Sequence, residues 1–206
     1  IERAGNVVLA ASRTKQETSQ GTLWGRADPI DLLVQAGAKV GLVNVEFGTD
    51  QVARHFPMAS DAFWKEILFR LRAANPEVNF DSTLGEERLM RFVGPDHAIP
   101  YVSFAQVLQE DPDKLKELFG NALVLVGRET QAAADVGAAQ VDVFATPFTT
   151  STGRFTPGVE LHATLIDNAI NRNSLQQAPT WARAIVLLLV SLWCALLPLR
   201  FRPLWS

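Results

Sequence analysis

The chain has 206 residues, of which 48% are hydrophobic and 20% are charged, as is ordinary for a globular protein that is large enough to bury a core. All 22 acidic residues but only 16 of the 19 basic residues precede Trp181, so this larger part has a net charge of −6, which argues against binding to nucleic acid or strong adsorption to anionic lipid. Cys194 is the single cysteine, which excludes an internal disulfide and a cysteine-based metal site.

Strands and helices are expected to alternate in the first part of the chain. Short apolar runs are typical of buried strands. Phe63, Ile67 and Leu71 recur every four residues, which predicts one apolar face of a helix. The expected order is a strand at 6–11, a loop at 21–28, a helix at 29–36, a strand at 39–45 and a helix at 60–73 that Ser60 caps.

The same alternation continues to residue 172. The run 122–126 (ALVLV), closed by Gly127, is the clearest buried strand, whereas residues 128–156 are polar and irregular. Further elements are strand pieces at 89–93 and 99–102, helices at 103–108 and 111–120, and a helix at 157–172 whose apolar face holds Val159, Ala163, Ile166 and Ile170. The pattern predicts an α/β fold with a mixed, largely parallel sheet covered by helices.

The segment 181–199 (WARAIVLLLVSLWCALLPL) is expected to be a transmembrane helix. Its 19 residues span roughly 28 Å, close to the thickness of a bilayer core, and Arg183 lies near one end, where it can snorkel to the interface. A buried helix of a larger core is the alternative. Arg200 and Arg202 follow the span without a nearby acid, which favours a cytoplasmic C-terminus.

These features predict four regions. They are an extracytoplasmic domain at 1–173, a connector at 174–180, a transmembrane helix at 181–199 and the start of a cytoplasmic segment at 200–206. Residues before Ile1 are expected, because a domain outside the membrane needs an export signal or an earlier membrane helix, and the N-terminus shows neither. The chain therefore reads as an N-terminally truncated fragment.

No motif for phosphate binding, dinucleotide binding or zinc-dependent hydrolysis is present, and no metal or cofactor is expected. Candidate ligand-binding residues are Arg54, which can pair with Asp50, and the group Asp135, Asp142, Thr146 and His162. Each has a plainer interpretation. Arg54 and Asp50 can form a surface ion pair, the acids and Thr146 can cap loop backbone groups, and His162 can be a hydrogen-bonded packing residue.

Several segments, in this order, resemble the second type of CHASE domain, a cyclase- and histidine-kinase-associated sensory extracellular domain. Family members have a glycine in the turn where this chain has Gln51. The resemblance covers nearly the whole chain. The segments that carry it are 4–10 (AGNVVLA), 40–45 (VGLVNV), 50–54 (DQVAR), 99–108 (IPYVSFAQVL), 119–127 (FGNALVLVG), 142–147 (DVFATP) and 157–163 (PGVELHA).

The resemblance implies a sensory domain outside the cytoplasmic membrane of a bacterium. It also implies further transmembrane helices and a cytoplasmic adenylate or guanylate cyclase, histidine kinase or serine/threonine kinase in the same protein. We expect a non-catalytic homodimer that touches the lipid bilayer and an unknown extracytoplasmic ligand. Two alternatives remain: a periplasmic scaffold or dimerisation domain without a ligand, and an anchored hydrolase that would pair His162 with Ser12, Ser103 or Ser151.

Overall fold

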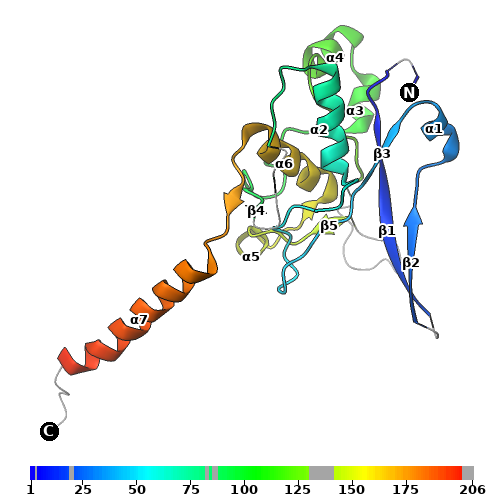
Figure 1. Cartoon of the computed structure of the whole chain (residues 1–206). Helices are drawn as coiled ribbons and strands as arrows, with labels where there is room; N and C mark the ends of the chain where they lie inside the picture. The colour runs from blue at the N-terminus through cyan, green and yellow to red at the C-terminus, as the bar shows by residue number, and fades with distance from the viewer. Residues whose placement is uncertain (3, 19–20, 82–83, 85–87, 130–141, 201–206) are drawn as a thin grey trace. The chain divides into compact units, whose positions relative to one another are not determined.

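The structure is a computed structural model that describes residues 1–2, 4–18, 21–81, 84, 88–129 and 142–200. It separates into two compact units, one from Ile1 to Leu175 and one from Gln176 onward (Figure 1). The first unit is a domain of mixed α/β structure, and the second consists mainly of one long helix. Each unit is described by itself.

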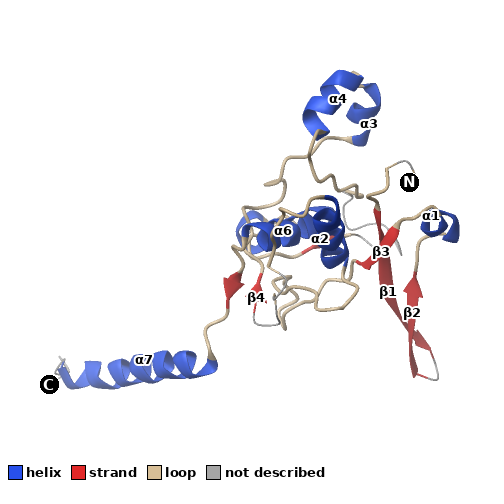
Figure 2. Cartoon of the chain, turned by 45° about the horizontal axis from the view of Figure 1, so that its top comes forward, coloured by secondary structure: helices blue, strands red, loops and turns tan. Residues whose placement is uncertain are grey.

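The largest sheet of the first unit has three strands in the order β2-β1-β3 (Figure 2). The central strand β1 (Val8–Thr18) pairs antiparallel with β2 (Gly21–Ala27), from Ser12 opposite Ala27 to Thr18 opposite Gly21. On its other side β1 pairs parallel with β3 (Lys39–Leu42). The sheet is therefore mixed, as expected, but the expectation that it is largely parallel is wrong.

The error has two physical sources. All residues of β2 are exposed, so this strand lacks the apolar alternation by which a strand is recognised, and it reads as a loop in the sequence. Conversely, the apolar run 122–126 belongs to no strand in the described part of the chain and is largely exposed, with Val126 at 81%. An apolar run becomes a strand only where a partner is available to pair with it.

The helices of the domain follow their local signals more closely. The expected helices at 29–36, 60–73, 103–108, 111–120 and 157–172 correspond to α1 (Asp31–Gln35), α2 (Phe63–Ala74), α3 (Phe104–Gln109), α4 (Pro112–Phe119) and α6 (Gly158–Asn171). The carboxylate of Asp111 accepts a hydrogen bond from the Asp113 N–H and caps α4, with Pro112 at its first position and Gly120 at its end. Ser60 does not cap α2, because that helix begins only after Ala62.

The remaining elements are short. Strand β4 (Arg88–Leu89) lies before α3, and β7 (Leu175–Gln176) lies at the boundary of the two units. Between them, β5 (Val143–Phe144) pairs antiparallel with β6 (Thr156–Pro157), and α5 (Thr149–Thr152) lies in the connection. Residues 142–156 belong to the stretch predicted to be irregular, but together with Pro157, which the sequence predicts to open the following helix, they form a small ordered hairpin.

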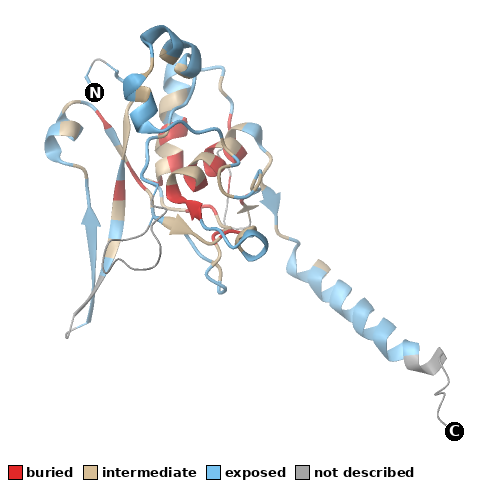
Figure 3. Ribbon diagram, turned by 180° about the vertical axis from the view of Figure 1, so that it is seen from behind, coloured by how far each residue is buried: buried red, intermediate tan, exposed pale blue. Residues whose placement is uncertain are grey.

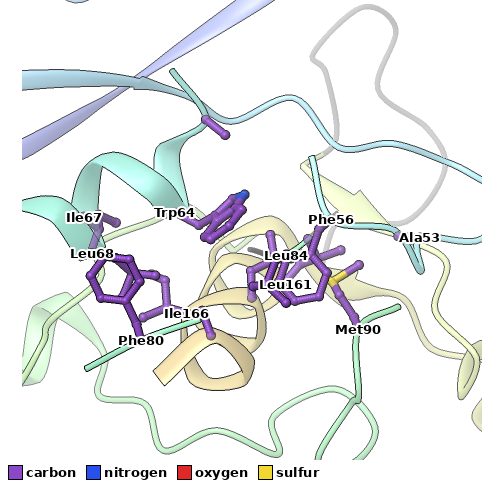
Figure 4. Packing of buried hydrophobic residues seen from close by; sticks show 13 residues of the cluster. Ala53, Phe56, Trp64, Ile67, Leu68, Phe80, Leu84, Met90, Leu161 and Ile166 are labelled. Carbon is purple, nitrogen blue, oxygen red and sulfur yellow. The ribbon is translucent and has the colours of Figure 1, made fainter. Parts of the chain in front are cut away.

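The core lies around α2 and α6, which pack against each other, while α2 also packs on β1 and β3 (Figure 3). Trp64, Ile67 and Leu68 of α2 are buried, and Phe63 and Leu71 pack at the edge, so the expected apolar face is confirmed (Figure 4). The expected apolar face of α6 is confirmed only in part, because Ile166 is buried whereas Val159, Ala163 and Ile170 are only partly buried. The helix runs through the core and buries Leu161, Leu165 and Ala169 instead.

A close approach between β3 and α2 explains one glycine. A Cβ atom at residue 41 would lie 2.5 Å from the Cα of Phe63, a distance at which the backbones would have to move apart. The isolated parallel bridge between Leu42 and Ala62 continues this contact. Gly41 therefore lets the sheet and the first turn of α2 approach closely.

The second unit contains α7 (Thr180–Arg200), which is 21 residues long. Its stretch Thr180–Leu197 has a mean hydropathy of 2.0, and none of that stretch is buried. By length and composition this helix is able to cross a membrane, and its exposure does not fit the alternative of a buried core helix. The hydroxyl of Ser191 donates to the Leu187 carbonyl, 2.7 Å away, so the polar group is satisfied within the helix.

Candidate functional site

The residues expected to bind a ligand lie on three neighbouring segments around the start of α6. The backbone N–H of Ala53 donates to the Ala145 carbonyl at 2.8 Å, which joins the turn around residues 48–54 to the β5–β6 hairpin. The rings of Phe47 and Phe144 lie 5.8 Å apart across the same junction. The structure thus brings the segments of Arg54, Asp142 and Thr146 together, whereas Asp135 lies outside the described residues.

The side chain of Arg54 pairs with Asp50. Its guanidinium lies 2.7–2.8 Å from both carboxylate oxygens, and this bond lowers the pKa of Asp50. The Asp50 carboxylate also accepts the Val52 N–H, which closes the turn. Gln51, at the position of the family's glycine, has a φ of 61°, a left-handed conformation that glycine adopts without strain.

Asp142 precedes β5 and packs against the beginning of α6. Its carbonyl accepts the Gly158 N–H at 3.0 Å, and its carboxyl packs so closely on Gly158 that a Cβ there would overlap it. The residue as a whole is exposed, but partial desolvation of the carboxyl raises its pKa. Gly158 is therefore required for this contact between the hairpin and the helix.

Thr146 is buried and holds the hairpin together. Its hydroxyl oxygen accepts a hydrogen bond from the Thr156 hydroxyl at 3.3 Å, and its backbone N–H donates to the Thr149 hydroxyl at 2.9 Å. These bonds are of the kind that closes a loop, which is the plainer interpretation of this residue.

His162 is buried in the core, with 5% of its surface exposed. Its Nε2 lies 3.2 Å from the Val43 carbonyl, its ring packs edge-on against Phe63, and its Nδ1 has no hydrogen-bond partner in the described part of the chain. Burial lowers its pKa to about 4. The ring is therefore neutral at pH 7, with Nε2–H donating to Val43, and ties α6 to the end of β3.

The low pKa of His162 predicts that the domain loses stability in acid. Folding favours the neutral ring, so its contribution is present above the unfolded pKa near 6.5 and is lost as the pH falls towards 4. We expect a loss of about 3 kcal/mol, measured by urea unfolding of the full chain in detergent micelles. The variant His162→Phe should lack this loss and His55→Gln should keep it, whereas the same acid loss in His162→Phe would contradict the assignment.

Neither ring nitrogen of His162 binds a serine, since Nε2 lies on the Val43 carbonyl and Nδ1 has no hydrogen-bond partner in the described part of the chain. The Ser151 hydroxyl donates to the Phe148 carbonyl at 2.9 Å, the Ser103 N–H donates to Gln106 at 3.1 Å, and Ser12 lies opposite Ala27 in the hairpin. The Nε2 of His162 is directed to Val43. This arrangement gives the hydrolase alternative no support.

A second polar group, which the sequence interpretation missed, lies on the other side of the α6 start. We call it the His97 cluster: Asp96, His97, Glu129, Arg154 and Glu160. The Nδ1 of His97 lies 3.0 Å from Asp96, its Nε2 lies 2.7 Å from Glu129, and Arg154 reaches Asp96 at 3.4 Å. No regular spacing connects these residues, so no sequence pattern could have indicated them.

Glu160 fixes the backbone beneath this cluster. Its two carboxylate oxygens accept the N–H groups of His97 and Ile99, at 2.8 and 3.2 Å. Glu160 and His162 thus serve opposite sides of α6, as expected for helix positions two residues apart. Burial by itself lowers the pKa of His97, but its bonds to Asp96 and Glu129 outweigh this effect and raise the pKa above 6.5.

Comparison with known proteins identifies the family. The model of the CHASE2 domain matches residues 2–197, which is nearly the whole chain. No curated protein and no solved structure matches significantly. The match includes the mixed domain, the residues around the start of α6 and most of α7. The chain therefore belongs to the CHASE2 family of extracellular sensory domains.

Proposed function

We propose that this chain is the extracytoplasmic sensor and first following membrane helix of a bacterial receptor, which passes a signal through α7 to a cytoplasmic cyclase or kinase. The observation that carries the proposal is continuity: the match to a sensory family extends from the domain into an apolar helix that is able to span a membrane. Arg200 and Arg202 favour a cytoplasmic C-terminus.

The link between domain and helix is short. Helix α6 ends at Asn171, where Arg172 has a φ of 53° and forms a left-handed cap, and α7 begins at Thr180. Helix α6 runs through the core, so a rearrangement of the domain can displace it. Only residues 172–179 lie between α6 and α7 and could take up that displacement. A short connection of this kind suits transmission by a shift of a helix between two positions.

The coupling is testable without knowledge of the natural signal. A cleavable export signal is placed before the chain and an adenylate cyclase catalytic domain after Ser206, and Asn168→Ala serves as a perturbation of the core of the outer domain. We expect this substitution to change cyclic AMP output, and the matched exposed change Asn171→Ala to leave the output unaltered.

Replacing residues 177–179 with a longer glycine-serine segment should then abolish the effect of Asn168→Ala while expression stays normal, because a flexible linker does not transmit a displacement. If Asn168→Ala changes the output equally through the flexible segment, transmission by the connector is contradicted.

The scaffold or dimerisation role remains a second candidate, and one observation favours it. Neither α3 nor α4 has a buried residue, and Phe104, Leu108 and Leu118 are exposed on them. Apolar side chains gathered at a surface are typical of protein contacts, here with a second copy of the chain. In this role the cyclase fusion, called the chimera below, would show no change in cyclic AMP output with Asn168→Ala.

A further inference from the structure

Three separate parts of the chain meet at His97, through its imidazole and its backbone N–H. The residue itself lies in the loop between β4 and α3, Glu129 lies after the apolar run 122–126, and Glu160 lies in the first turn of α6. The side chain of Asp96 is only 8% exposed, and its carboxylate pairs with both His97 and Arg154. His97 is therefore the point that connects these segments.

The geometry around the ring selects its charged form. Both ring nitrogens face carboxylate oxygens, of Asp96 at 3.0 Å and of Glu129 at 2.7 Å. A neutral imidazole has one N–H and one lone pair, so it can satisfy only one of these two acceptors and would turn its lone pair towards the other. Only the protonated ring donates to both.

The surrounding charges act in the same direction. Among the described residues, the carboxylates of Asp96 and Glu129 lie on the ring nitrogens, and Glu160 binds the backbone N–H of the same residue. Arg154 is 69% exposed and is bound to Asp96 rather than to His97. The Tyr101 ring covers the imidazole with its centroid 4.7 Å away. The two carboxylates on the ring nitrogens favour a cation at the position of His97.

The backbone of His97 has an uncommon conformation that its hydrogen bonds hold in place. His97 has a φ of 64°, in the left-handed region that is uncommon for residues other than glycine. The bonds from Glu160 to the His97 and Ile99 N–H groups hold this conformation. A loop of this kind persists while its contacts persist and has another conformation available when they are lost.

We propose that His97 is a proton-operated latch, which in its charged form ties the 95–99 loop to Glu129 and in its neutral form releases that contact. The latch is a property of the domain alone. Its use as an input signal rests on the proposed sensory function, in which the site faces the medium outside the cell.

The sign of the pH effect follows from the direction of the shift. The pKa of His97 is raised above its unfolded value, so the contribution of the latch to stability is complete below about pH 6.5 and is lost as the pH rises through the folded pKa. This pH dependence is opposite to that of His162, so the contributions of the two histidines to stability can be distinguished.

The test is a pH titration of the full chain, with 13C-labelled histidine, in detergent micelles by NMR. The chain has three histidines, and the variants His97→Asn and His55→Asn assign their NMR signals, each by the signal that disappears. Asparagine is chosen because it tolerates the left-handed backbone of residue 97. We expect the His97 midpoint to lie above about 6.5. It should fall in Glu129→Gln and stay unchanged in Glu117→Gln, which removes the same charge from the exposed α4.

Hydrogen exchange of the His97 and Ile99 amides supplies a second measurement, corrected for intrinsic rates. In the wild-type protein these two amides should be protected from exchange at about pH 5 and unprotected at about pH 8. In His97→Asn they should be unprotected at both pH values. A His97 midpoint at or below about 6.5, a midpoint insensitive to Glu129→Gln, or equal wild-type protection at both pH values would overturn the latch. None of these outcomes bears on the chimera, so a failed latch and a failed sensor remain distinguishable.

Discussion

Replacing Trp64 with alanine is expected to lower the free energy of unfolding by about 3–5 kcal/mol. The side chain is 1% exposed and lies edge-on against Phe56, with ring centroids 5.5 Å apart (Figure 4). Its indole N–H donates to the Pro57 carbonyl at 3.0 Å. Alanine would leave a cavity between α2 and the core and a buried carbonyl without its partner.

The matched control is Trp24→Ala in β2, where the tryptophan is 70% exposed and a change within about 0.5 kcal/mol is expected. Both variants are measured by urea unfolding of the full chain in detergent micelles, followed by circular dichroism. Equal losses for the two tryptophans would mean that the core is not centred on α2 as described.

Asn168→Ala is expected to have an effect of similar size for a different reason. Asn168 is fully buried, and its amide group accepts the Arg91 N–H at 2.6 Å and donates to the Arg91 carbonyl at 2.9 Å. Alanine would remove both part-buried bonds to Arg91, at about 0.5–1.5 kcal/mol for each, and would leave a cavity at a fully buried position. The substitution should therefore detach the segment after β4 from α6.

The control lies one turn further along the same helix. Asn171 is exposed and its amide donates to the half-buried Asp167, so Asn171→Ala should change the free energy of unfolding by less than about 0.5 kcal/mol. The same unfolding assay applies, together with hydrogen exchange at residue 91. If Asn168→Ala is as mild as Asn171→Ala, the two bonds to Arg91 do not hold this segment.

The elements that the sequence predicts correctly are those with local signals. Asp111, Pro112 and Gly120 mark α4 from beginning to end, because each acts on the backbone within one turn. The span of α7 follows from composition alone, since a bilayer requires about 20 apolar residues in succession. The apolar face of α2 likewise follows from helical periodicity.

The sheet was harder to predict because pairing is a long-range property. Strand β2 is exposed along its whole length, so its sequence does not distinguish it from a loop. The run 122–126 has strand propensity but no strand partner in the described residues. The parallel pairing of Val8 with Lys39 depends on α1 and its flanking loops, which no single window of sequence contains.

The candidate site was predicted in part for the same reason. Arg54 with Asp50 is a local turn, and the expected ion pair is found. The packing interpretation of His162 agrees with its burial, although nothing in the sequence shows that its partners are Val43 and Phe63. The ligand-binding roles stay predictions for all five candidate residues, which are Arg54, Asp135, Asp142, Thr146 and His162.

The His97 cluster shows what a single sequence does not reveal. Its contacts connect residues 32 to 63 positions apart, between Glu129, Glu160, Arg154 and the pair Asp96–His97. Each residue is ordinary in its own segment, and only the fold places two carboxylates on one imidazole. Such a cluster is found from coordinates and not from spacing.

The most direct test of the account is the side of the membrane on which the domain lies. In cells that produce the protein from its full reading frame, Cys194 is replaced by alanine and the exposed Lys114 of α4 by cysteine, which gives this region a single reactive thiol. A membrane-impermeant maleimide should label residue 114 in intact spheroplasts. Labelling that appears only after the membrane is permeabilised would place the domain in the cytoplasm and contradict an extracytoplasmic sensor anchored by α7.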